Sequence, residues 1–377
     1  MKISLSRSVL RSAAIGLFLT GASIASATAV HADATDGIVV TSPTAAEANS
    51  WRGITFGNGT FVAVAQGGNN RVMTSTNGTS WTARTAAEPN SWTAVAYGGG
   101  TFVATATSGT NRIMSSPDGV TWTPHLPLLV DLDSIAYGNG TFVAVSSNDA
   151  STFTSADGAN WSGPHSLPTS DHWTSIAFGN GIFVAVASDG TNGIITSTDG
   201  ITWTTHVAPE LNSWTSVTYG NGLFVAVAGS GTNRVMTSAD GVNWTAHAAS
   251  SVGYWHSVAA GGGYFMAIAP TEGLMVSTDG ATWVSLAGAD AGGNWEAMTY
   301  GDNKFVGVAN VGDIRVVRAE IPASTTTTTV APATTTTPAV NLPATGSSNN
   351  NVIAFAALMT IAGLALILRR RNTRDLV

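Results

Sequence analysis

Residues 214–247 read WTSVTYGNGLFVAVAGSGTNRVMTSADGVNWTAH, which is four apolar or β-branched runs separated by turn signals. Asn221-Gly222 and Asp240-Gly241 are hairpin dipeptides, because the central residues of such turns adopt positive φ. Four short strands with tight connections describe one four-stranded antiparallel meander. The run LFVAVA at 223–228 does not alternate polar and apolar residues, which indicates that both faces of this sheet are buried.

The meander repeats along the chain. Aligned on the glycine that ends the pattern W-x-x-[IVM]-x-[FYA]-G, seven copies follow one another at intervals of 40 or 41 residues: Gly57, Gly98, Gly138, Gly179, Gly220, Gly261 and Gly301. One meander cannot cover both of its own faces, so neighbouring sheets must stack on each other, and a ring of such blades is a β-propeller. We therefore predict an all-β fold at residues 33–321, a seven-bladed β-propeller of four-stranded antiparallel blades.

The two ends of this domain complement each other. Residues 36–51, DGIVVTSPTAAEANSW, align without gaps to residues 77–92, NGTSWTARTAAEPNSW, and so supply a fourth strand with no first three before it. Residues 295–319 supply three strands with no fourth after them. We predict that the N-terminal strand completes the last blade, which closes the ring and removes two exposed sheet edges. An open solenoid would need capping repeats instead.

Six octapeptides join the third strand of a blade to the fourth: TSTNGTSW, SSPDGVTW, TSADGANW, TSTDGITW, TSADGVNW and VSTDGATW. They resemble the Asp-box, or bacterial neuraminidase repeat, of a family of propellers. The resemblance implies that Ser, Asp and Gly hold the turn, with the carboxylate accepting backbone N–H groups and the Trp capping the core. The matching acid positions are Asn77, Asp118, Asp157, Asp199, Asp240 and Asp279.

The resemblance implies a fold and no activity. Asp and Gly are adjacent here, whereas the sialidase motif has a residue between them, and the short form is closer to photosystem assembly factors and other non-hydrolytic propellers. A sialidase-like glycosidase needs convergent arginines, a tyrosine nucleophile and an acid, and other glycosidases need paired carboxylates. Acids outside the boxes are scattered, and the histidines lack metal-ligand spacing. We predict no catalytic residue, cofactor or metal ligand.

The N-terminal segment carries Lys2, Arg7 and Arg11, followed by a stretch of apolar and small residues at 12–30. This pattern predicts a secretory signal peptide at residues 1–32, with a stop-transfer helix as the alternative. Residues 322–341 are rich in Thr and Pro without apolar periodicity, which predicts an extended stalk. The chain has no cysteine, which excludes thiol catalysis and thiolate metal sites.

Residues 342–377 resemble the sorting signal of Gram-positive wall proteins: an LPxTG motif, an apolar segment at 352–368 and a cluster of arginines. The motif is Leu342, Pro343, Ala344, Thr345 and Gly346. The resemblance implies that a sortase cuts after the threonine and joins Thr345 to peptidoglycan, so the protein is secreted and held in the wall. The apolar segment predicts a transmembrane helix in the precursor alone, and a permanent single-span anchor is the alternative.

Residues 33–321 contain eight basic and 21 acidic residues, a net charge of −13 that argues against nucleic acid as a partner. In a meander, the loops after strands two and four emerge on one face, where recognition normally takes place. These loops supply the predicted ligand face: Asn70, Arg71, Asn111, Arg112, Asn192, Asn233, Arg234 and Arg315. Beside the tryptophans, such residues could bind a glycan or an acidic peptide. Alternatively, each Arg pairs with an acid such as Glu88 or Glu210.

Together these features predict a wall-anchored, non-catalytic binding module or adhesin for an extracellular glycan or protein. A passive component of the surface layer and an extracellular glycosidase are the alternatives.

Overall fold

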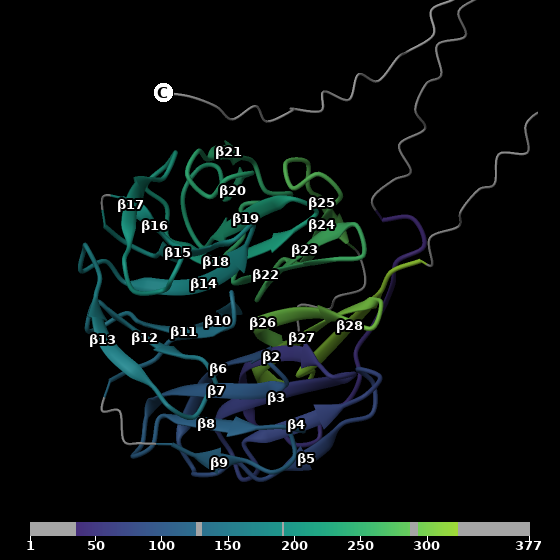
Figure 1. The fold of residues 1–377 in the computed structure, drawn as a ribbon. Coiled ribbons are helices and arrows are strands. Elements are labelled where there is room, and N and C mark those ends of the chain that lie inside the picture. The colour runs from purple at the N-terminus through teal and green to yellow at the C-terminus, as the bar shows by residue number, and fades with distance from the viewer. Residues whose placement is uncertain (1–34, 126–129, 191, 287–292, 323–377) are drawn as a thin grey trace, which may run out of the picture. The chain divides into compact units, whose positions relative to one another are not determined.

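A computed structural model describes residues 35–125, 130–190, 192–286 and 293–322. Within them, 28 strands form seven four-stranded antiparallel sheets arranged around a central axis (Figure 1). The predicted seven-bladed propeller is confirmed. The predicted signal peptide, nearly all of the stalk, the sorting signal and its apolar segment lie outside the described residues. No described helix is long and apolar enough to cross a membrane.

Each blade is a meander numbered from the centre outward. The first three blades are β2 (Ser50–Gly57), β3 (Thr60–Gly67), β4 (Val72–Ser75) and β5 (Thr82–Arg84); β6 (Ser91–Gly98), β7 (Thr101–Ser108), β8 (Ile113–Ser116) and β9 (Thr123–Pro124); β10 (Ser134–Gly138), β11 (Thr141–Ser146), β12 (Ser151–Ser155) and β13 (Ser162–Ser166). The next three are β14 (Trp173–Gly179), β15 (Ile182–Ala187), β16 (Gly193–Ser197) and β17 (Thr204–Val207); β18 (Trp214–Gly220), β19 (Leu223–Ala228), β20 (Val235–Ser238) and β21 (Thr245–His247); β22 (Ser257–Gly261), β23 (Tyr264–Ala269), β24 (Gly273–Ser277) and β25 (Val284–Leu286).

The seventh blade is built from both ends of the domain. It contains β26 (Gly293–Gly301), β27 (Lys304–Gly312), β28 (Val316–Glu320) and, as its outer strand, β1 (Val39–Thr41). Val40 pairs with Ala319 in the antiparallel register of this last ladder. Gly37 has a φ of 75°, within a few degrees of the glycines in the six complete turns. The N-terminal strand therefore closes the ring as predicted.

The hydrophobic core is divided into seven clusters, each shared between two adjacent blades. In one of them, Val62 and Val64 of β3 pack with Trp92 and Phe102 of the next blade. The other face of β3, including Phe61, packs against the blade on the opposite side. Both faces of the second strand are thus buried, which explains why these runs do not alternate polar and apolar residues.

The repeated glycine at the end of each first strand lies against the next blade. A Cβ atom at Gly98 would lie 2.0 Å from Cγ of Tyr137. The Tyr137 ring in turn packs on Phe142, with ring centroids 4.7 Å apart. A side chain at this glycine would overlap the neighbouring ring, so the spacing between blades requires glycine here.

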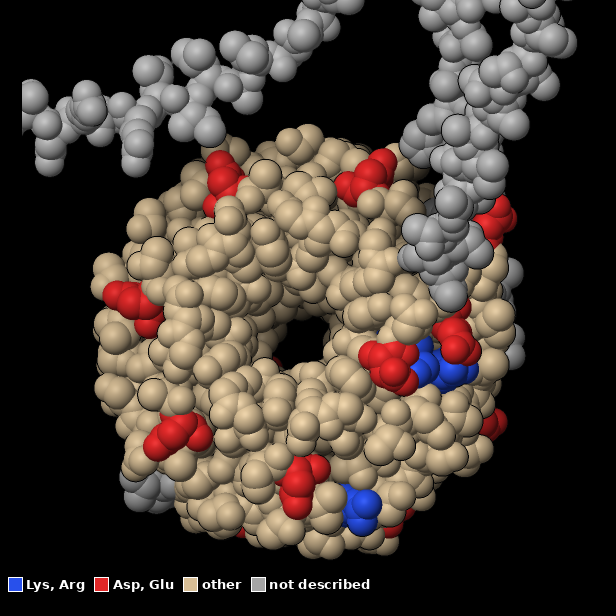
Figure 2. All heavy atoms as spheres, turned by 45° about the vertical axis from the view of Figure 1, so that its right-hand side comes forward, with Lys and Arg blue, Asp and Glu red and all other residues tan. Residues whose placement is uncertain are grey.

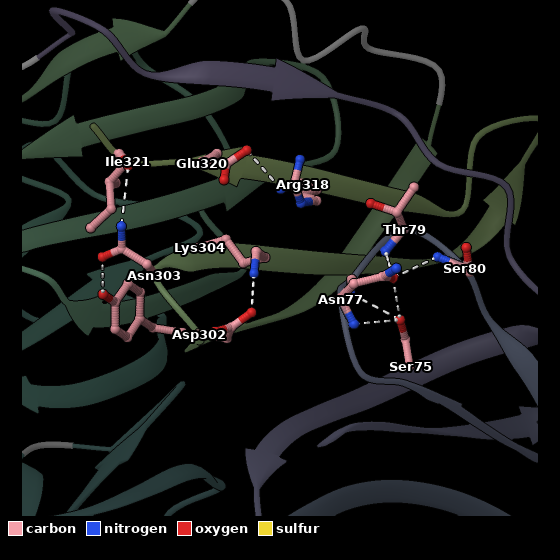
Figure 3. A network of polar contacts seen from close by, with 12 residues as sticks. Ser75, Asn77, Thr79, Ser80, Asp302, Asn303, Lys304, Arg318, Glu320 and Ile321 are labelled. Carbon is pink, nitrogen blue, oxygen red and sulfur yellow. Dashed lines mark hydrogen bonds and ion pairs between the residues drawn. The ribbon is translucent and has the colours of Figure 1, made fainter. Parts of the chain in front are cut away.

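The six octapeptides form S-x-[DN]-G turns with one geometry. In the Asp199 turn, Oδ1 accepts the N–H groups of Ile201 and Thr202, both at 2.8 Å, and Ser197 Oγ accepts the N–H of Gly200. The first turn carries an amide instead, and Asn77 Oδ1 accepts the same two bonds from Thr79 and Ser80 at 2.9 Å (Figure 3). An amide oxygen therefore holds this turn as a carboxylate does.

We expect Asp118→Asn and Asp199→Asn, combined, to change stability at pH 7 by less than about 0.5 kcal/mol and to weaken its acid dependence. Backbone N–H groups, first those of Thr121 and Thr202, hold the pKa of each carboxyl below its usual range. The unfolded chain then binds more protons, so this stabilisation is complete above about pH 4 and is lost as the pH falls through the folded pKa. The check is the urea midpoint of unfolding, measured for wild type and variant from pH 7 to pH 2.5. If the midpoint falls with pH by the same amount in both proteins, the prediction is wrong.

The blades present two different faces. The tight-turn face carries the hairpins between first and second strands and the S-x-[DN]-G turns, and the loop face carries the connections after second and fourth strands. Both ends of the domain lie on the tight-turn face, because a Cβ at Gly37 would contact Pro322 and the Ile321 N–H points to Asn303 O. Figure 2 shows the ring from one side, with its central opening and acidic side chains spaced around it.

Candidate functional site

The four arginines of the predicted ligand face connect neighbouring blades. Nη1 of Arg71 donates to Asn90 O at 2.7 Å, and Nη1 of Arg315 donates to Asn49 O at 2.7 Å, each across to the loop that enters the next blade. Arg234 donates in the same way to the carbonyl of Gly253. Arg112 is the exception, because it pairs with a carboxylate, that of Asp131, at 2.6 Å.

The asparagines that precede three of these arginines are held by a glutamate. Glu210 accepts the backbone N–H of Asn233 at 3.0 Å and its side-chain amide at 2.5 Å. Glu47 and Glu88 bind Asn70 and Asn111 in the same two-point manner. The hydrogen bonds from Asn233 hold the pKa of Glu210 below its usual value. Glu88 and Glu210 therefore bind asparagine, and the predicted pairing of these acids with arginine is wrong.

These contacts favour a structural use of the predicted ligand face. The tryptophans that open the first strands are at most 1 % exposed, so their rings are closed to a ligand. The strand-four histidines are also engaged: His206 Nε2, for example, lies 2.8 Å from Thr196 Oγ1. Ligand binding by these arginines and asparagines stays a prediction. It is weakened because several of their N–H groups already donate hydrogen bonds within the protein.

The central channel holds a cavity of about 670 Å³, lined by the first strands of all seven blades and the residues just before them. Ionisable and aromatic side chains gather where these strands begin, on the loop face. We call this set the channel mouth: Arg52, Asp133, His172, Tyr254, His256 and Glu296.

All six residues occupy the two positions that flank the first-strand tryptophan of a blade, or the leucine that replaces it. Two blades carry the triplet Ser-Trp-Thr there, at 91–93 and 213–215. The threonine ties adjacent blades, since Thr215 Oγ1 donates to Trp255 O at 2.6 Å. The other five triplets are SWR, DLD, HWT, YWH and NWE, at 50–52, 131–133, 172–174, 254–256 and 294–296. Comparing these positions between repeats would have found the channel mouth from the sequence.

Three consecutive blades contribute a charged cluster to the channel mouth. The Glu296 side chain is 4 % exposed; its Oε1 accepts from Arg52 Nη1 at 2.8 Å, and its Oε2 lies 3.4 Å from His256 Nε2. His256 Nδ1 lies 2.8 Å from Glu296 O, and because a carbonyl only accepts, this nitrogen carries the proton. Nδ1 of His256 is therefore engaged, whereas Glu296 Oε2 has no hydrogen-bond partner among the described residues. Arg52 contacts Glu296 through Nη1 and keeps its other N–H donors.

The opposite side of the channel mouth carries a carboxylate and a histidine. Asp133 Oδ2 accepts from the Ser147 hydroxyl at 2.6 Å and from its N–H at 3.0 Å, which leaves Oδ1 free to accept from a ligand. His172 is exposed, with Nδ1 3.1 Å from Ser188 Oγ. Among the described residues, no group of three His, Asp or Glu side chains could hold a metal ion.

Two family models match parts of the chain. A DUF6242 β-propeller domain matches residues 129–250, and the LPXTG cell wall anchor motif matches residues 334–374, which include Leu342 to Gly346. The chain is a secreted β-propeller protein of the Gram-positive cell wall. The anchor motif implies that a sortase processes this wall-anchored propeller and attaches it covalently to peptidoglycan. Attachment through Thr345 stays a prediction.

Solved structures share the fold of the wall-anchored propeller at low sequence identity. A streptogramin B lyase is 12 % identical, with a TM-score of 0.68, over 77 % of this chain and 100 % of its own. A catalytically inactive variant of virginiamycin B lyase from Staphylococcus aureus, solved with quinupristin, is 12 % identical, with a TM-score of 0.66, over 76 % and 100 %. YCF48 bound to D1 peptide is 16 % identical, with a TM-score of 0.58, over 76 % and 96 %. No curated protein matches the chain.

Proposed function

We propose that this wall-anchored propeller is a non-catalytic binding module, an adhesin, that takes an extracellular glycan or protein at its channel mouth. The observation that carries the proposal is the departure from Ser-Trp-Thr in five blades. Where the triplet is kept, its threonine ties two blades, whereas Asp133 in the same place accepts from Ser147 of its own blade and keeps Oδ1 free. Side chains that depart from a repeat and converge on one cavity are typical of a ligand site.

The channel mouth and the last described residue lie on opposite faces of the propeller. The chain runs from Pro322, on the tight-turn face, towards the sorting signal. The loop face, with the channel mouth, lies at the other end of the strands. The last described residue, Pro322, therefore lies on the face opposite the channel mouth.

The part of the channel mouth formed by Arg52, His256 and Glu296 is already committed to contacts between blades. A general base needs a free ring nitrogen or carboxylate within reach of its substrate. Nδ1 of His256 is engaged with the Glu296 carbonyl group, and the Glu296 carboxylate is buried and bound to Arg52 through Oε1. The S-x-[DN]-G turns lie on the opposite face and serve the fold, which supports their assignment as Asp-boxes of the non-hydrolytic kind. Among the propellers of similar fold, YCF48 was solved with D1 peptide and the inactive lyase variant with quinupristin.

The proposal is tested with the full-length chain displayed on a Gram-positive host, by adhesion of the cells to immobilised glycans, mucins and matrix proteins. We expect Asp133→Asn with His172→Ala to reduce adhesion at least tenfold, because both side chains face the cavity and neither ties blades together. The matched control is Arg71→Ala with Arg234→Ala on the outer loops, which we expect to keep adhesion within about twofold. Unchanged adhesion of the channel-mouth variant would contradict the proposal, and loss in the control alone would move the site to the outer arginines.

A further inference from the structure

We propose that the channel mouth binds an uncharged carbohydrate, with Tyr254 as the platform on which a sugar ring stacks. This inference rests on the proposed function and adds the chemical class of the ligand. It is carried by three features of the channel mouth: one exposed aromatic ring, a mixture of hydrogen-bond donors and acceptors, and charges that are mostly neutralised by their neighbours.

Tyr254 is a large side chain that lines the channel and stays 48 % exposed. Its ring is held in place, because a Cβ at Gly229 would lie 2.4 Å from the tyrosine Cε2 and because His256 lies beside it, with ring centroids 5.8 Å apart. A supported aromatic ring offers a flat apolar face at little conformational cost. The C–H face of a sugar ring is a ligand surface that such a platform fits.

The polar groups of the channel mouth can satisfy hydroxyl groups, which both donate and accept. Arg52 donates to Glu296 through Nη1 and keeps its other N–H groups for a ligand. Asp133 Oδ1 can accept. His172 is exposed on the same rim. The cavity of about 670 Å³ falls within the range of about 300–1,000 Å³ that small-molecule sites occupy.

The charges argue against an anionic ligand. Arg52 is neutralised by Glu296, and Arg112, which does not line the cavity, is neutralised by Asp131. Among the described residues, Asp133 has no basic partner, and the net charge of the domain is −13. A sialylated or sulfated glycan or an acidic peptide would meet net negative charge at the channel mouth. An uncharged sugar meets no such barrier.

The experiment is retention of the full-length chain, in detergent, on an array that carries uncharged oligosaccharides, sialylated and sulfated glycans, and unmodified peptides. We expect retention on uncharged oligosaccharides, at least tenfold weaker for Tyr254→Ala and within about twofold of wild type for Tyr254→Phe, which keeps the ring. Leu211→Ala is the control, since Leu211 is 73 % exposed on the loop face and lies outside the cavity. Folding of each variant is checked by its thermal midpoint.

The outcomes separate the inference from the proposed function. Retention only on acidic glycans or peptides, weakened by Asp133→Asn with His172→Ala, would overturn the carbohydrate inference and keep the channel mouth as a binding site. Retention on uncharged sugars that Tyr254→Ala leaves intact would also overturn it. Retention on no probe would overturn both.

Discussion

Gly98→Ala is expected to destabilise the propeller by about 2–3 kcal/mol, with a matching fall in the urea midpoint at an unchanged slope. The new Cβ would lie 2.0 Å from Cγ and 2.1 Å from Cδ1 of Tyr137. The ring would have to leave its place on Phe142, and the two blades would have to separate at their inner strands. Gly98 is not among the glycines with positive φ, so the effect is steric rather than a strain of the backbone.

Gly67→Ala is the matched control. Gly67 lies at the end of a second strand and also has no positive φ, and a Cβ there would meet only the Ser50 Cβ at 3.8 Å. We expect its stability to stay within about 0.5 kcal/mol of wild type. Equal and small effects at both glycines would mean that the blades do not pack at the observed spacing.

The propeller architecture could be predicted from the sequence because every repeat carries the same pattern of strands and turns. The period of 40 or 41 residues, the Asn-Gly and Asp-Gly dipeptides and the non-alternating second strands leave a ring of stacked meanders as the simplest solution. Closure of the ring could be predicted as well, since residues 36–51 align with a complete fourth strand and the final repeat lacks one. The structure places Val40 opposite Ala319 in agreement with that alignment.

The candidate site was harder to predict, because a repeat pattern does not show which side chains face the axis. Arg71 and Arg234 looked free in the sequence, and only the neighbouring blade reveals the carbonyl groups they bind. Arg52 and His256 are separated by 204 positions, and the closed ring brings both to Glu296. That these residues differ from the Ser-Trp-Thr triplet was visible in the sequence. That their side chains meet follows only from the packing of the sixth, seventh and first blades in the closed ring.

A disulfide between the two ends of the domain is expected to form and to stabilise it strongly. Val40 and Ala319 are directly opposite in the ladder between β1 and β28, and Cβ atoms of facing residues are about 4.5–5.5 Å apart, close enough for a disulfide after a small adjustment. The chain has no cysteine of its own, so the pair has no competing thiol. Constraining so long a loop contributes about 4–5 kcal/mol, or about 10 °C in thermal midpoint for a domain of this size.

The control places the second cysteine at the corresponding strand of a blade across the ring, as Val40→Cys with Thr196→Cys. Thr196 lies in β16 of the fourth blade, which does not adjoin the seventh. We expect these two thiols to stay reduced under the same mild oxidation. The control shows whether bond formation reports proximity in the folded state or only collisions of a loose chain end.

Both ends of the domain meet in one blade and so close the ring. This closure is tested most directly by titrating free thiols in the Val40→Cys, Ala319→Cys variant of the full-length chain after mild oxidation, with non-reducing electrophoresis to separate monomer from dimer. We expect both thiols to disappear in a monomer that migrates faster than its reduced form. Two thiols that remain free, or a cross-link found only between molecules, would contradict it.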